Sequence, residues 1–151
     1  MIRLNVLLLF RLVVSGIFIV SGAEKLLSPM ENFLYVIQNY HVLPWPVLER
    51  LTALVFPWAE LFLGVFLLLG LWTRVSLYGV AVMSGSFIFV VGQAIARKLP
   101  IESCGCFGEL LKVPLPVIVA MDSTIAACAI LMLCNLSLTN AFSLDRVFLK
   151  K

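Results

Sequence analysis

The sequence has few charged residues and one histidine. Charged residues make up 13% of its 151 positions, and hydrophobic residues make up 62%. An ordinary soluble domain is excluded, because about a quarter of its residues would be charged. The formal net charge is only +3, and the basic residues are dispersed, without the patch that nucleic-acid binding requires. We therefore expect a protein of the lipid bilayer that binds no nucleic acid.

Cysteine is also scarce, with four residues in the chain. Four cysteines do not make the disulfide framework of a small secreted domain. Cys104 and Cys106 lie outside the long apolar runs. They could hold Cu(I), or half of a zinc site with His41 as a further ligand. The spacing of a four-ligand site is absent, so no metal site is predicted.

Four long apolar runs account for most of the chain. They cover residues 4–22, 51–71, 75–96 and 115–136. Since a helix needs about 20 apolar residues to cross a bilayer, the pattern predicts an all-α integral membrane protein. We expect one four-transmembrane-helix bundle over residues 1–151. Arg11 interrupts the first run, which favours a membrane helix over a cleaved signal peptide.

The connections between these runs differ in character. Residues 24–50 mix apolar and polar positions, which predicts an amphipathic helix at the interface, with Tyr35, Tyr40 and Trp45 at headgroup depth. The short sequence LWTR predicts a tight hairpin between the second and third runs. In the third run, Ala81 and Gly85 are four residues apart, a pattern that permits close helix packing in lipid.

Four spans place residues 24–50 and 97–116 on one face of the membrane and both termini on the other. Each face carries five Lys or Arg residues, so the positive-inside rule does not decide the orientation. Disulfides persist in oxidising compartments. We therefore expect cytoplasmic termini, with Cys104 and Cys106 in a periplasmic or extracellular loop.

The sequence IESCGCFGEL contains the most specific motif. In an extended chain the Cα atoms of Cys104 and Cys106 would be about 6.6 to 7 Å apart, near the upper limit of roughly 6.8 Å for a disulfide. A turn is needed, and Gly105 and Gly108 permit it. So small a ring would stabilise the fold little, whereas strained disulfides are labile and suit catalysis or regulation. The alternative is a glycine-rich turn with unused thiols.

The other two cysteines, Cys128 and Cys134, lie within the fourth apolar run. Their spacing of six residues puts them on different faces of a helix, where they cannot pair with each other. We expect both to be buried packing residues.

Ionisable residues inside the apolar runs are Arg11, Glu60 and Asp122. Each costs about 2.5 to 3.5 kcal/mol at a helix centre, so such residues usually face inward and pair. We expect Arg11 to pair with Glu60 or Asp122, while Glu24 and Lys25 lie near the loop-side interface. Such polar groups could line a quinone headgroup site or a proton path. The alternative is an ion pair that fixes helix register.

These features together resemble those of the MauE/DoxX family of small redox-associated membrane proteins, most closely its MauE branch. The motifs that carry the resemblance are Arg11, GAEKL at residues 22–26, AELFLG at residues 59–64, Arg74, and CGCFG at residues 104–108. The resemblance implies a protein of the bacterial inner membrane that exchanges thiols and disulfides with a thioredoxin-like partner on the outer side. It also makes a quinone a candidate cofactor.

The sequence thus predicts a membrane thiol-disulfide oxidoreductase. Cys104 and Cys106 would be its catalytic residues, Gly105 and Gly108 would shape the loop, and Phe107 with Trp45 would form apolar walls. The alternative is a non-catalytic accessory subunit of a larger membrane complex.

Overall fold

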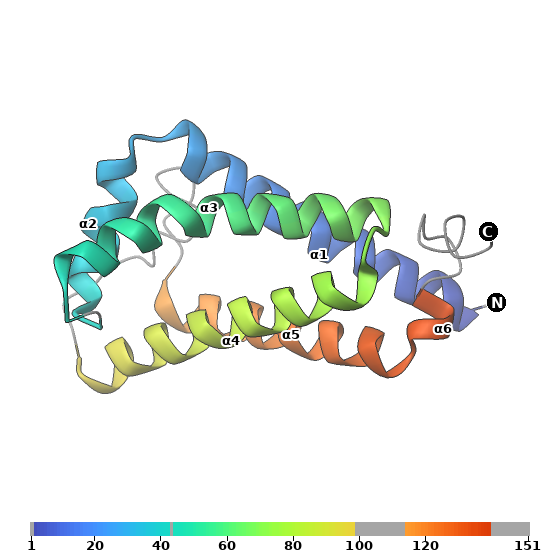
Figure 1. Cartoon of the computed structure of the whole chain (residues 1–151). Coiled ribbons are helices and arrows are strands. Elements are labelled where there is room, and N and C mark those ends of the chain that lie inside the picture. Colours follow the sequence, from blue (N-terminus) through green and yellow to red (C-terminus); the bar gives the residue numbers. More distant parts are fainter. Residues whose placement is uncertain (1, 43, 99–113, 140–151) are drawn as a thin grey trace.

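The structure is a computed structural model that describes residues 2–42, 44–98 and 114–139 (Figure 1). Every regular element in these residues is a helix, as the sequence predicts. The elements are α1 (Ile2–Leu27), α2 (Met30–Tyr40), α3 (Pro46–Leu69), α4 (Thr73–Ala96), α5 (Leu115–Cys134) and the single turn α6 (Leu136–Thr139).

Four of the helices are long and apolar enough to cross a membrane. These spans are Asn5–Leu27, Pro46–Leu69, Thr73–Ala96 and Leu115–Cys134. A helix of 24 residues, such as α3 or α4, is about 36 Å long, which exceeds the roughly 30 Å hydrocarbon core of a bilayer. The predicted all-α membrane bundle is therefore confirmed.

Two boundaries differ by more than two residues from the sequence-based expectation. The first helix continues to Leu27, beyond the expected end at residue 22, and α3 begins at Pro46 instead of residue 51. Proline is favoured in the first turn of a helix, because its missing N–H group has no partner to lose there. The longer α1 therefore includes Glu24 and Lys25, which were expected in the connection between the first two spans.

The two ends of the bundle carry different connections (Figure 1). Helix α2 lies at the end where α4 finishes and α5 begins, while the start of α1, the α3–α4 turn and α6 lie at the other end. The α3–α4 turn is tight, as predicted, with Gly70 and Trp72 both at positive φ. Gly70 ends α3 in the left-handed conformation that lacks a steric penalty for glycine.

Helix α2 is the amphipathic helix expected between the first two spans, although it is shorter than residues 24–50. It covers one end of the bundle, because Tyr40 is buried and packs in one cluster with apolar side chains of α4 and α5, including Val91 and Ile118. Tyr35 and Trp45 are exposed. Burial raises the pKa of the Tyr40 hydroxyl to about 12, so this side chain is neutral at physiological pH.

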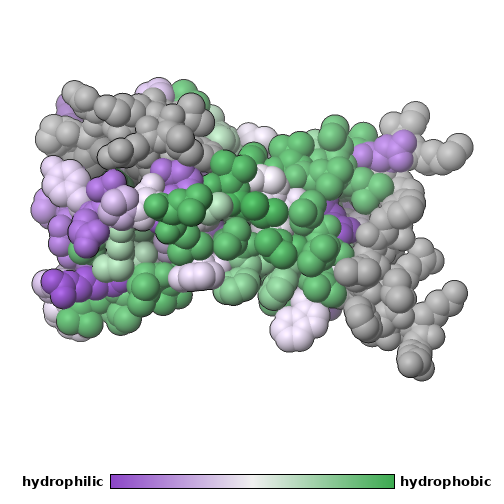
Figure 2. Space-filling view, turned by 90° about the horizontal axis from the view of Figure 1, so that it is seen from above, coloured by the Kyte–Doolittle hydropathy of each residue, from purple (hydrophilic) through white to green (hydrophobic). Residues whose placement is uncertain are grey.

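The main hydrophobic core lies between the four long helices. It contains Leu7, Val14, Phe18, Leu67, Leu77, Val80, Met83, Ile125, Ala129 and Met132. The outer surface is also apolar: Figure 2 shows a broad hydrophobic band across the middle of the visible face, with hydrophilic residues toward the ends. An apolar exterior is what a bundle surrounded by lipid requires.

Close backbone packing occurs between α1 and α3. Of the two small residues of α4 predicted to pack, Ala81 packs against the core and Gly85 does not. A Cβ atom added to Gly22 would lie 2.7 Å from the backbone nitrogen of Leu61, and one added to Gly64 would lie 2.9 Å from that of Ile19. At Gly85, no described atom lies within 4 Å of that position. The prediction for Gly85 is therefore wrong, and Gly22 and Gly64 allow the backbones of α1 and α3 to meet.

Candidate functional site

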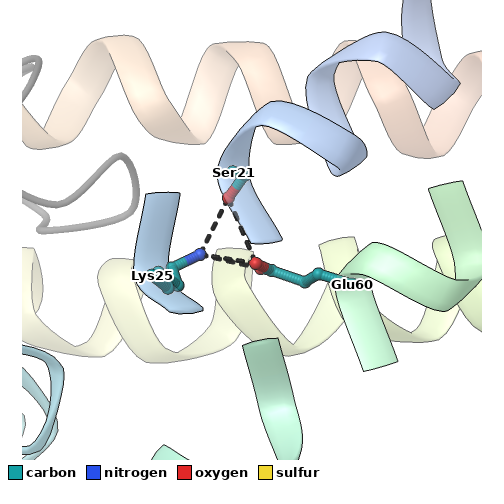
Figure 3. Close-up of polar contacts among 3 residues, drawn as sticks. All are labelled: Ser21, Lys25 and Glu60. Atoms are coloured by element: carbon teal, nitrogen blue, oxygen red, sulfur yellow. Dashed lines mark hydrogen bonds and ion pairs between the residues drawn. The ribbon is translucent and has the colours of Figure 1, made fainter. Parts of the chain in front are cut away.

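A buried ion pair joins α1 to α3 inside the bundle (Figure 3). The Lys25 ammonium lies 2.7 Å from Oε2 of Glu60 and 2.9 Å from Oε1, and it also donates to Ser21 Oγ at 2.8 Å. Ser21 in turn donates to Glu60 Oε2 at 3.2 Å. The two charged side chains are only 1% and 3% exposed. All three ammonium donors therefore have acceptors, as a buried charge requires.

The spacing along α1 explains this arrangement. Ser21 and Lys25 are four residues apart, so they lie on one face of the helix, and both reach Glu60 on α3. The backbones approach closely beside them, because Gly22 contacts α3 at Leu61. The short distance between helices brings Glu60 within reach of both side chains.

Two aromatic rings flank the Lys25 ammonium. The Phe33 and Phe87 ring centroids each lie 5.4 Å from Nζ, within the range of a cation–π interaction. Phe33 comes from α2 and Phe87 from α4. The Lys25 ammonium thus contacts side chains from α1, α2, α3 and α4. These contacts link α2 to three of the spanning helices.

Asp122 of α5 lines a small cavity that Glu60 of α3 also lines. The cavity has a volume of about 20 Å³, and Ser21, Glu60, Phe87 and Asp122 contribute to its wall. Asp122 is only 7% exposed. A space of this size can hold about one water molecule, provided that polar partners line it. Glu60 and Asp122 therefore line the same small cavity, together with Ser21 and apolar side chains.

Arg11 pairs differently from the prediction. Its guanidinium donates to the carbonyl oxygens of Leu67 at 2.6 Å, Leu68 at 3.0 Å and Thr139 at 3.3 Å. Among the described residues it forms no ion pair with Glu60 or Asp122, so the predicted pairing is wrong. The last carbonyls of a helix lack intrahelical partners and carry partial negative charge. Arg11 satisfies those of α3 and holds α6 against the bundle.

Lys25 and Glu24, which were expected near the loop-side interface, lie two and three residues before the end of α1. Both lie within α1 and are buried, at 4% and 7% exposure. Lys25 therefore acts as the cation for Glu60, the role that was expected of Arg11. Charge alone could not distinguish the two candidates. The spacing of Ser21, Gly22 and Lys25 on one helix face was the sequence signal that favoured Lys25.

A larger apolar cavity lies between α2, α3 and α4. We call it the α2–α3–α4 cavity; it has a volume of about 270 Å³, and its wall includes Phe33, Phe56 and Phe87. Phe56 and Phe87 meet edge to face, with centroids 5.4 Å apart. Phe87 lines this cavity and also the small cavity beside Glu60. No pattern in the sequence predicted this space, because three separate helices enclose it.

The loop with the predicted catalytic residues Cys104 and Cys106, together with Gly105, Phe107 and Gly108, lies outside the described residues. Its flanking helices are described: α4 ends and α5 begins at the α2 end of the bundle (Figure 1). Trp45, the expected apolar wall from the other connection, is exposed directly before α3.

The remaining cysteines, Cys128 and Cys134, are both free thiols, as predicted. Cys128 is partly buried and packs against the core. Cys134 is exposed at the end of α5, so the prediction that both are buried is wrong for Cys134. Within residues 2–42, 44–98 and 114–139, no group of three His, Cys, Asp or Glu side chains could hold a metal ion.

Comparison with known proteins identifies a family. The model of the family described as methylamine utilisation protein MauE matches residues 3–136, which is most of the chain. No curated protein and no solved structure matches. The matched segment includes all four spanning helices and the CGCFG motif. The chain therefore belongs to the MauE family, and it is a multi-pass membrane protein of a redox or electron-transfer-related pathway.

Proposed function

We propose that the protein is a thiol-disulfide redox protein of the bacterial inner membrane, in which Cys104 and Cys106 cycle between dithiol and disulfide. The observation that carries this proposal is the CGCFG motif in the connection between α4 and α5 of a MauE-family chain. Family membership supports the redox pathway, and the motif supplies the two thiols that such a pathway can use.

The exchange proceeds through a mixed disulfide. A thiolate of Cys104 or Cys106 attacks one sulfur of a partner disulfide, and the other partner sulfur leaves as a thiolate. The second cysteine then attacks the mixed disulfide. The products are a Cys104–Cys106 disulfide and a partner dithiol, so two electrons pass to the partner; the reverse sequence of steps oxidises the partner.

The partner that fits this chemistry is a thioredoxin-like protein, which presents a dithiol or disulfide of its own. A chain with one such cysteine pair outside its helices needs a second redox partner to turn over. A membrane quinone fits that need, because it takes up two electrons and two protons to become a quinol. The dithiol would then return to the disulfide with release of the same two electrons and two protons.

The experiment is to trap the mixed disulfide. Cys104→Ser and Cys106→Ser variants are made in a Cys128→Ser, Cys134→Ser background, and membranes are alkylated and analysed without reducing agent. We expect a reducible adduct with a partner protein in at least one variant, and none in the variant without any cysteine. If neither variant forms an adduct and both retain function, the redox proposal is wrong.

The alternative function, that of a non-catalytic accessory subunit, has a different outcome in the same strains. A larger membrane complex would fall apart when this protein is deleted. It would remain assembled and active with the Cys104→Ser, Cys106→Ser double variant. Such a result favours the accessory role over thiol chemistry.

We further propose that the termini are cytoplasmic and that the cysteine loop faces the outside. Single-cysteine variants that retain Cys104 or Cys134 test this, because Cys134 lies at the opposite end of α5 from the loop. After reduction, a membrane-impermeant maleimide should label Cys104 in intact cells and Cys134 only in broken cells. The opposite pattern would show that the orientation is wrong.

A further inference from the structure

The proposed thiol chemistry does not use the α2–α3–α4 cavity. Its volume of about 270 Å³ exceeds the roughly 150 Å³ of an engineered apolar cavity that binds benzene. A single six-membered ring with small substituents therefore fits. Because α2 covers the end of the bundle and α3 and α4 are spanning helices, a ligand would enter from the bilayer or its interface.

The wall of the cavity favours a ring over a flexible chain. Phe33, Phe56 and Phe87 come from three different helices. Phe56 and Phe87 are held edge to face at 90°, and the Lys25 ammonium lies 5.4 Å from the ring centroids of Phe33 and Phe87. Aromatic pairs prefer stacked and edge-to-face geometries, which an acyl chain cannot offer. The aromatic walls thus favour a planar, ring-shaped ligand.

Three side chains of the wall carry hydroxyl groups, Tyr40, Thr52 and Ser86, and the two aliphatic hydroxyls supply acceptor oxygens. Thr52 donates its hydroxyl proton to the Leu48 carbonyl at 2.8 Å, and Ser86 donates to the Val82 carbonyl at 2.9 Å. With their protons committed to helix carbonyls, both oxygens can still accept a hydrogen bond. A ligand that donates, such as a phenol, complements them better than one that only accepts.

We propose that the α2–α3–α4 cavity binds a lipid-soluble molecule with one six-membered aromatic ring that carries a hydroxyl donor, the chemical class to which quinols belong. Phe33, Phe56 and Phe87 hold the ring, and the hydroxyl oxygen of Thr52 or Ser86 accepts a hydrogen bond from the ligand hydroxyl. Binding itself does not require Cys104 or Cys106. Only the use of such a ligand in electron transfer rests on the proposed function.

The test uses three fluorinated probes with the full chain in lipid nanodiscs. The probes are 4-(trifluoromethyl)phenol, (trifluoromethyl)benzene, which lacks the donor, and 1,1,1-trifluorododecane, which mimics an acyl chain. Binding is followed by the broadening of the ¹⁹F resonance, after subtraction of the signal in empty nanodiscs. We expect saturable binding of the phenol, at least threefold tighter than that of either other probe.

Matched variants locate the binding. Val90→Phe fills the cavity and should abolish phenol binding, whereas Val82→Phe, on the exposed face of the same helix, should not. At least one of Ser86→Ala and Thr52→Val should weaken binding about three- to tenfold, because one of these two oxygens accepts the hydrogen bond. Wild-type binding in both variants would contradict the assigned acceptors. Ser123→Ala removes an equivalent hydroxyl on α5 and should leave binding unchanged. Ser86 is exposed, so this comparison holds even if Val90→Phe does not fold.

Several outcomes would overturn the inference. These are equal binding of the phenol and the benzene probe, tighter binding of the chain probe, or saturable binding that Val90→Phe leaves intact. A variant with both Cys104→Ser and Cys106→Ser should bind the phenol like the wild type. Failure of the thiol-trapping experiment and failure of phenol binding are thus separate results.

Discussion

Lys25 Nζ lies 2.7 Å from Glu60 Oε2, and this contact joins α1 to α3 where the two backbones also meet at Gly22. The ion pair has Ser21 as a shared hydrogen-bonding partner and two phenylalanine rings beside the cation. Because each donor of the buried ammonium has an acceptor, the ion pair holds α1 against α3. It also forms the polar boundary of the small cavity that contains Asp122.

Removal of one partner of this pair should destabilise the bundle. Glu60→Gln leaves the Lys25 ammonium without its counter-charge, and we expect a loss on the order of 3 kcal/mol in the free energy of unfolding. The measurement is unfolding of the purified protein in mixed detergent micelles. Glu31→Gln is the matched control, because Glu31 is exposed on α2, and it should lie within about 0.5 kcal/mol of the wild type.

The double variant Lys25→Met, Glu60→Leu distinguishes charge from packing. Removal of both charges leaves no uncompensated ion, so its stability should be closer to the wild type than that of either single variant. Additive losses in the double variant would show that the two side chains act independently, contrary to the contact described above.

The close approach of α1 and α3 predicts a strong response at Gly22. In Gly22→Ala the new methyl group would meet backbone atoms of Leu61 and Pro57, at 2.7 and 2.9 Å, and backbone cannot move aside as a side chain can. We expect a loss of about 1 to 3 kcal/mol in the free energy of unfolding.

Gly85→Ala is the matched control, because no described atom lies within 4 Å of its added Cβ. Alanine is a better helix former than glycine, so this variant should be as stable as the wild type or more stable, by up to about 1 kcal/mol. Equal effects at Gly22 and Gly85 would contradict the assigned α1–α3 interface.

Arg11 should be needed to hold the end of α3. Arg11→Gln removes charged hydrogen bonds to the carbonyls of Leu67 and Leu68, and we expect a loss of about 2 kcal/mol in stability. Amide hydrogen exchange should increase in α6 and in the turn after α3. Arg74→Gln, an exposed basic residue in the first turn of α4, should leave exchange in these segments unchanged. A protected α6 in Arg11→Gln would refute the role.

Stability should fall at high pH because of Tyr40. Burial raises the pKa of its hydroxyl to about 12 in the folded protein, from an ordinary value of 10.0. The unfolded chain then loses this proton at lower pH than the folded protein does, so the free energy of unfolding decreases as pH rises from about 10 to about 12. Tyr40→Phe should remove this part of the pH dependence. The measurement is the free energy of unfolding of the wild type and of the variant at a series of pH values between about 9 and about 12.

The sequence predictions were correct for features that depend on neighbouring residues and wrong for contacts between residues far apart in the sequence. The four spans are each a local run of apolar residues, and the hairpin between α3 and α4 is set by a few adjacent positions. Both were therefore predictable from short segments. The partner of Glu60 was not, since it depends on which face of α1 meets α3, and a long Lys side chain at residue 25 can reach a carboxylate as readily as Arg11 could.

The sequence alone determined that this chain crosses a membrane four times, because bilayer thickness sets the length of an apolar helix and backbone groups in lipid must pair within it. It also determined which two thiols lie between the third and fourth spans. The tertiary structure decided that Lys25 pairs with Glu60, that Arg11 binds the end of α3, and that three helices enclose an aromatic cavity. Each of these depends on the distance and rotation between helices that are far apart in the sequence, and close backbone contact at Gly22 and Gly64 sets that geometry for α1 and α3.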